Sequence, residues 1–147
     1  FSNIAGSEST HTEAVRALLV AYDIADPVGT TPVVGVFVDP AMAELYRALT
    51  ARGSASLPEA LAVGAPVEDL DIRDLAGHLA STDKADIRTV YEQLLRGSRN
   101  HLRSFVGQIT TRGGSYSPTY MSQAAFDSVL STPRETGEGY GRGRDAR

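Results

Sequence analysis

The amino-acid sequence predicts an all-α protein with three long helices and two short ones. In three long segments the apolar residues recur every three or four positions, the spacing that places them on one face of an α-helix. Four segments are preceded by serine or aspartate, whose side chains cap the first turn of a helix. The run VVGVFV (33–38) has the composition of a strand, but it has no partner strand, so we expect a packed loop there.

The first helix is expected over residues 3–22. The segment 23–40 that follows contains three prolines and two glycines, which exclude a continuous helix. A short second helix is expected to begin after Asp39, with Pro40 in its first position, and to end at Gly53. Proline fits this first position because its missing N–H would have no partner there.

The third segment begins with Ser56 and Glu59, which have the spacing of a capping box. We expect a long helix from there to about residue 80. Pro66 lies inside this helix and predicts a kink, because it removes a backbone donor. Gly64 would ease the bend.

The fourth helix is the longest in the prediction. Asp83 can cap its start, and Gly113 and Gly114 suit its end. A fifth, short helix is expected over residues 122–130, with Ser122 as its cap.

The chain has 147 residues, enough for one domain with a substantial core, which we place at residues 1–131. The tail 132–147 is rich in glycine and arginine and has no apolar periodicity. Such a composition cannot bury enough apolar surface to fold, so we expect this tail to be disordered.

Charge and composition exclude several classes of function. The net charge of −4 provides no positive field for nucleic acid or an anionic membrane surface. The absence of cysteine excludes disulfides, thiolate metal sites and cysteine nucleophiles. No apolar run approaches the roughly 20 residues of a membrane span, and no nucleophile-elbow motif indicates a serine hydrolase. We expect a soluble protein, in a compartment that the sequence leaves undetermined.

Titratable residues occupy inward positions on all three long helices. Glu8 and His11 lie on the apolar stripe of the first helix, at Glu-x-x-His spacing. Glu68 takes a core position in the third helix, and Asp71 lies about one turn on. His101 lies near the edge of the apolar arc of the fourth helix. Burial of a lone carboxylate costs several kcal/mol unless it is paired, protonated or bound to a metal.

Two interpretations follow from these inward residues. Carboxylates and imidazoles that converge from facing helices form dinuclear metal sites in helical bundles. Alternatively, Glu68 forms a buried salt bridge with Arg99 or Arg103, and His101 is a core histidine bonded to a backbone carbonyl. In that case the chain is a metal-free interaction module with a buried Glu/His hydrogen-bond network. His78 and Glu92 are left out of the site, because the first lies near a helix end and the second lies opposite His101.

Several stretches together resemble the ferritin-like family catalogued as domain of unknown function 2202. The likeness covers about residues 1–131, in the same order and with few gaps. The stretches are SESTHTEAVRALLVAYDIADP, GVFVDPAMAELYRALTARGSASLPEALAVGA, VEDLDIRDL, VYEQLLRGSRNHLRSFV and YSPTYMSQAAFDSVL.

The resemblance implies a ferritin-like up-down helical bundle with a dinuclear metal centre, in which iron is expected and manganese or zinc are the alternatives. It assigns metal-ligand roles to Glu8, His11, Glu68 and His101. The fourth helix has Ser98 where a second Glu-x-x-His would have its glutamate, so either Asp71 substitutes or the site is poorer in carboxylate than that of better-known relatives.

The resemblance also implies an acidic helix at the start of the family fold that has no counterpart here, as in an N-terminally truncated chain. Loss of that helix would expose an apolar groove and favour self-association into a homo-oligomer. The resemblance gives a type of site and no reaction or substrate.

Overall fold

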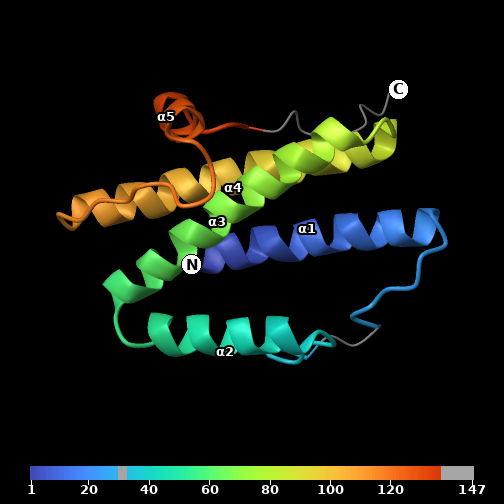
Figure 1. The fold of residues 1–147 in the computed structure, drawn as a ribbon, viewed down its shortest axis with the longest axis horizontal. Coiled ribbons are helices and arrows are strands. Elements are labelled where there is room, and N and C mark those ends of the chain that lie inside the picture. The colour runs from blue at the N-terminus through green and yellow to red at the C-terminus, as the bar shows by residue number, and fades with distance from the viewer. Residues whose placement is uncertain (30–32, 137–147) are drawn as a thin grey trace, which may run out of the picture.

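The computed structural model describes residues 1–29 and 33–136. This part of the chain forms five helices, whose arrangement Figure 1 shows. Helices α3 and α4 pack against each other, α2 packs on α3, and α1 and α5 each pack on α4. The helices are α1 (Ser2–Ala21), α2 (Pro40–Gly53), α3 (Leu57–Ser81), α4 (Ala85–Thr111) and α5 (Gln123–Ser131). The all-α prediction is confirmed, since the described residues contain no strand.

Most helix starts follow from the capping residues in the sequence. The side chains of Asp39, Ser56 and Ser122 accept hydrogen bonds from backbone N–H groups in the first turns of α2, α3 and α5. The prediction that Asp83 caps α4 is wrong. This helix begins one residue later, with Lys84 at its N-cap, and Asp86 in the first turn accepts from the N–H of Ile87 instead.

The hydrophobic core lies mainly between α3 and α4 and is closed at one side by α5. It comprises Leu61, Ala65, Ile72, Leu102, Phe105, Val106, Phe126 and Val129. Gly64 has a packing role here, because a Cβ at this position would lie 2.4 Å from two atoms of the Phe105 ring. Helix α3 is continuous through Pro66, so the expected kink does not end the helix.

Asp69 holds the segment that leads to α5 against α3. Its side chain is fully buried and accepts hydrogen bonds from the Tyr116 hydroxyl and from the backbone N–H groups of Thr119, Tyr120 and Met121. Burial alone would raise the pKa of Asp69, but these donors outweigh it and hold the pKa below its usual range.

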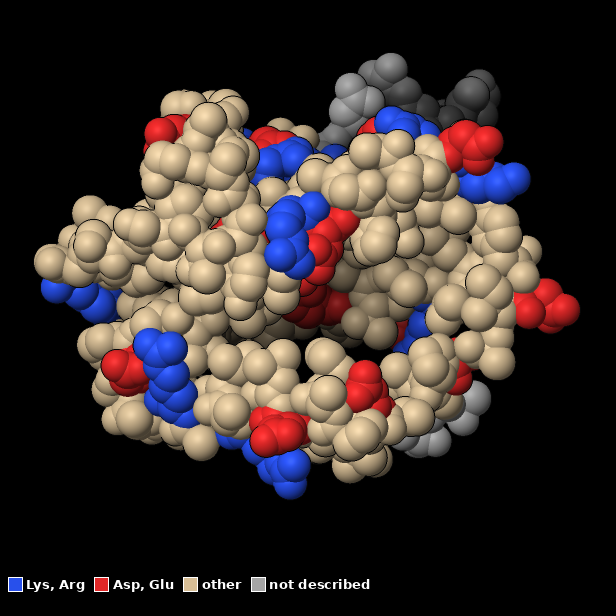
Figure 2. Space-filling view, viewed as in Figure 1, with Lys and Arg blue, Asp and Glu red and all other residues tan. Residues whose placement is uncertain are grey.

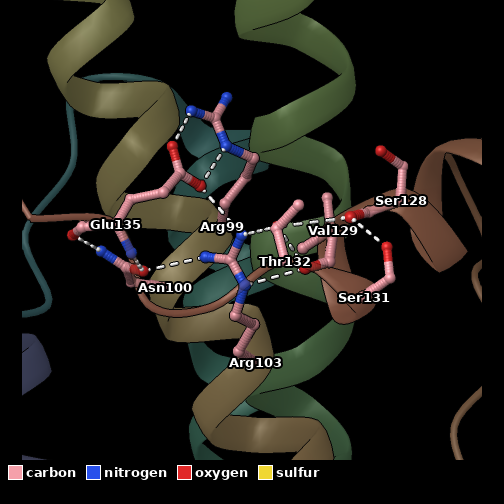
Figure 3. Close-up of polar contacts among 8 residues, drawn as sticks. All are labelled: Arg99, Asn100, Arg103, Ser128, Val129, Ser131, Thr132 and Glu135. Atoms are coloured by element: carbon pink, nitrogen blue, oxygen red, sulfur yellow. Dashed lines mark hydrogen bonds and ion pairs between the residues drawn. The ribbon is translucent and has the colours of Figure 1, made fainter.

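A second polar cluster joins the chain after α5 to α4, as Figure 3 shows. Glu135 forms a bidentate ion pair with Arg99, and Arg103 Nη2 lies 2.9 Å from Glu135 Oε1. Asn100 exchanges two hydrogen bonds with the backbone of Glu135, at 2.8 and 2.9 Å. The predicted salt bridge of Arg99 or Arg103 with Glu68 is therefore wrong, because both arginines are engaged by Glu135.

Residues 132–136 of the tail expected to be disordered contact α4 through Glu135 and through the Thr132 hydroxyl, which accepts a hydrogen bond from Arg103 Nη2. The remainder of the predicted tail, 137–147, lies outside the described residues.

The prediction of a packed loop at 33–38 is wrong. Val34 is 88% exposed and Val38 is 79% exposed. Phe37 stacks on Tyr46 of α2 with ring centroids 5.4 Å apart, but no helix of the described residues covers the valines. The segment is therefore an exposed apolar loop. Among the described residues, no helix combines the length and the apolar character needed to cross a bilayer.

We predict that Asp69→Asn destabilises the protein by about 3 kcal/mol, because an amide cannot accept from all four donors and leaves buried N–H groups without partners. Urea unfolding at pH 7 measures the effect. Asp74→Asn is the matched control on the same helix, since Asp74 is exposed and pairs only at the surface. Equal unfolding free energies for the two variants would contradict the assigned role of Asp69.

Candidate metal centre

Three helices bring ligand atoms together at one point inside the protein. Glu8 comes from α1, Glu68 from α3 and His101 from α4, and one ligand atom of each lies within 4.8 Å of the others. Glu68 is 5% exposed and His101 is 8% exposed. His101 Nδ1 lies 3.0 Å from Glu8 Oε1 and 3.3 Å from Glu68 Oε1. These three residues were predicted as ligands from their positions on separate helices.

Among the described residues, no hydrogen-bond partner is found for three buried atoms of this group. They are Glu8 Oε1, Glu68 Oε2 and His101 Nδ1. His101 Nδ1 and Glu8 Oε1 face each other at 3.0 Å as an ion pair, whereas Glu68 Oε2 has no such contact among the described residues. Buried polar atoms are almost always paired, and oxygen and nitrogen atoms that converge without pairing match the donor set of a divalent cation.

The second oxygen of Glu8 faces a second histidine. His11 Nδ1 lies 3.2 Å from Glu8 Oε2, and since a carboxylate only accepts, the imidazole is the donor. The rings of His11 and His101 have their centroids 6.0 Å apart. Glu8 therefore has one imidazole at each carboxylate oxygen, although His11 lies outside the group formed by Glu8, Glu68 and His101.

Asp71 lies near this group but does not belong to it. It lines the same groove as Glu8 and Glu68, and burial followed by the negative charges of these two residues raises its pKa to about 6. Ser98 is 3% exposed, one helical turn before His101, where a Glu-x-x-His would have its carboxylate. Ser98 is therefore buried, and as a serine it brings no negative charge to the site.

The pKa values of the three residues shift by different amounts and for different reasons. Contact with His101, reinforced by the hydrogen bond with His11, lowers the pKa of Glu8 to about 2. Contacts with Glu68 and Glu8 raise the pKa of His101 to about 9 despite its burial. Burial raises the pKa of Glu68 above its usual value. Without a metal, the group at pH 7 contains a proton on His101 that a bound cation would have to displace.

An open apolar groove leads to the carboxylates between α1, α2 and α3. It has a volume of about 510 Å³, and its walls include Phe1, Ile4, Leu49, Val63, Val67 and Phe105. Glu8, Glu68 and Asp71 also line it. Figure 2 shows the molecule hollowed on this face, with acidic side chains beside the hollow.

Two other residues behave as the sequence indicates. His78 is exposed near the end of α3 and its ring contacts that of Tyr91, and Glu92 pairs with Arg88 at 3.8 Å.

Asp69 was not predicted from the sequence as an internal residue, although it is fully buried directly beside Glu68. The four-residue step from the core residue Ala65 to Asp69 is the signal that places it inside.

The fold and the site define an all-helical protein in which a buried carboxylate and a buried imidazole meet the partly exposed carboxylate of Glu8. The chain belongs to the family of the uncharacterized protein domain DUF2202, whose model matches residues 1–133. It is similar to the uncharacterized protein MJ0754 of Methanocaldococcus jannaschii, with 46% identity over 137 residues, which are 93% of this chain and 74% of that protein.

The fold is also similar to the crystal structure of hypothetical protein MJ0754 from Methanococcus jannaschii DSM 2661. The TM-score is 0.87 at 46% identity, and the match covers 92% of this chain and 77% of that chain. These matches confirm the family predicted from the sequence, while the ferritin-like character of the bundle stays a prediction.

The charges of the group predict how the stability of the metal-free protein depends on pH. The pKa of His101 is raised from 6.5 to about 9, so its contacts stabilise the fold fully below pH 6.5 and are lost as the pH rises through about 9. The pKa of Glu8 is lowered from 4.5 to about 2, so its contribution is present above pH 4.5 and is lost as the pH falls through about 2.

Urea unfolding of chelator-treated protein at a series of pH values tests this prediction. The wild type should lose stability between pH 6.5 and 9, and His101→Gln should be less stable at pH 6.5 but show a flatter profile. Parallel profiles for the two proteins would show that His101 is not coupled to the carboxylates.

Proposed function

We propose that this chain is the ferritin-like domain of a protein that binds two divalent metal ions, with iron as the expected metal, where α1, α3 and α4 meet. The observation that carries the proposal is the set of three buried ligand atoms without hydrogen-bond partners, contributed by Glu8, Glu68 and His101. The ion pairs of His101 with Glu8 and Glu68 fit a metal-free network as well, so the metal hypothesis is favoured chiefly by Glu68 Oε2, a buried oxygen with no partner among the described residues.

The ligand roles follow from the way Glu8 lies between the two histidines. Glu8 would bridge the two ions, because each of its oxygens faces a different imidazole. His101 and Glu68 would hold the first ion. His11 would serve the second, with Asp71 as the nearest additional carboxylate in the place left open by Ser98. The second position is less complete, since His11 and Asp71 lie outside the group of three.

The chemistry of the donors favours iron or manganese. Carboxylate oxygens outnumber imidazoles in this set, which suits these ions better than copper, while zinc also binds such ligands. A pair of bound iron ions would supply redox chemistry toward dioxygen or peroxide. The chain's own residues would orient the ions, keep them between the helices and, at His101, release a proton when an ion binds.

The groove beside Glu8, Glu68 and Asp71 would be covered in a longer protein. The family resemblance implies an acidic helix that would close the apolar walls and add a carboxylate to the second ion position. The match covers 74% of the length of the archaeal relative. In this chain alone, the same groove would favour a homo-oligomer.

We predict that His101→Ala abolishes stoichiometric Fe²⁺ binding, because it removes the imidazole from the group of three. Anaerobic titration of the purified protein with Fe²⁺, followed by metal analysis per chain, measures the loss. His78→Ala is the matched control, since His78 is an exposed histidine far along α3 from Glu68. Circular dichroism checks that both variants keep their helices. Full Fe²⁺ occupancy in the His101→Ala variant would refute the assignment.

A further inference from the structure

We propose that Gly97 is a positioning residue of the metal centre, whose missing side chain gives the His11 ring its place against α4. The inference rests on the proposed metal-binding function, because it concerns the histidine at the second oxygen of Glu8. Gly97 itself offers no ligand and acts only through His11.

The space above Gly97 is filled by the imidazole of His11. A Cβ at Gly97 would lie 2.4 Å from His11 Cε1 and 2.5 Å from His11 Nε2, much closer than two unbonded atoms can approach. The ring nitrogen next to Cε1, Nδ1, donates a hydrogen bond to Glu8 Oε2. The ring is therefore confined between Glu8 and the backbone of α4, and its side chain is only 16% exposed.

Neither helix formation nor backbone conformation explains a glycine at this position. Glycine inside a helix costs about 1 kcal/mol relative to alanine, and Gly97 lies well inside α4. Its φ is not positive, so alanine would fit the backbone. Gly97 precedes His101 by four residues and shares its face of α4, which is the face turned toward α1. The requirement for glycine thus comes from the His11 ring.

A substitution at Gly97 would affect metal binding by changing the orientation of the Glu8 carboxylate. A methyl group at Gly97 would push the imidazole away from α4 and break its contact with Glu8 Oε2. The carboxylate would then lose the partner that fixes its rotation, and Oε1 would no longer be held toward Glu68 and His101. Partners that orient a ligand in this way are typically worth a factor of about 10–100 in metal affinity.

The matched control is Gly107, another glycine inside α4. No atom lies within 4 Å of a Cβ at Gly107, so alanine there meets no obstacle. Both substitutions replace glycine by alanine in the same helix and both should increase helix propensity. A difference between them in metal affinity therefore reports the contact with His11.

The test is anaerobic Fe²⁺ titration of the wild type, Gly97→Ala, Gly107→Ala, His11→Ala and the double variant Gly97→Ala/His11→Ala. We expect Gly97→Ala and His11→Ala each to weaken Fe²⁺ binding at the position of Glu8, Glu68 and His101 about 10–100-fold, and His11→Ala to lose the second ion as well. Gly107→Ala should bind as the wild type does. The double variant should be no weaker than His11→Ala alone, because the methyl group has no ring left to displace.

Unchanged Fe²⁺ affinity of Gly97→Ala beside a functional wild type would overturn this inference and leave the proposed function standing. Additive losses in the double variant would also overturn it, because Gly97 would then act independently of His11. No Fe²⁺ binding by the wild type would overturn the proposed function, and with it the role of Gly97 in metal binding.

Discussion

The meeting of two carboxylates and an imidazole between α1, α3 and α4 constrains the rest of the structure. Glu68 and His101 are almost fully buried, and charges in such a place are tolerated only in the company of opposite charge or a cation. Helix α1 has no fully buried residue. Its position against α4 therefore depends strongly on the polar contacts of Glu8 with His101, together with the packing of Ile4 on the core and of His11 on Gly97.

Two neighbouring acids on α3 show the difference between a structural carboxylate and one that we propose as a metal ligand. Asp69 accepts from four donors and fixes the segment that leads to α5. Glu68, one residue earlier, keeps an oxygen without any partner. Glu135 belongs to the structural kind, because Arg99 and Arg103 compensate its charge fully and lower its pKa to about 2. The apolar core and these anchors hold α3 and α4 rigidly enough to keep Glu68 facing His101.

Helix boundaries and the main site residues could be predicted from the sequence because both depend on local spacing. Capping residues such as Ser56 and Ser122 specify where helices begin, and the apolar stripes of three helices indicate that Glu8, Glu68 and His101 point inward. Contacts between residues far apart in the chain could not be predicted in this way. Nothing near Glu135 indicates that it pairs with Arg99, because the two residues lie on different segments and only the fold brings them together.

Close contacts between helices could not be predicted from the sequence either. Gly64 suggests an eased bend, whereas the structure shows it making room for the Phe105 ring. The valines of 33–38 suggest a packed loop, but burial depends on a covering surface that the described residues do not provide. The arrangement of the site, with Glu8 between two histidines and Asp71 at its edge, depends on how three helices pack together. It could not be derived from the spacing within any one helix.

The most direct test of the account is the position of iron in a crystal of this protein loaded with Fe²⁺ under anaerobic conditions. Anomalous diffraction at the iron edge locates the metal independently of any assumption about its ligands. The account predicts a peak within bonding distance of Glu8, Glu68 and His101, with a second and weaker peak on the side of His11. No peak at this point, with His101 Nδ1 hydrogen-bonded to a carboxylate or a water molecule, would show that the cluster is a buried polar network and not a metal centre.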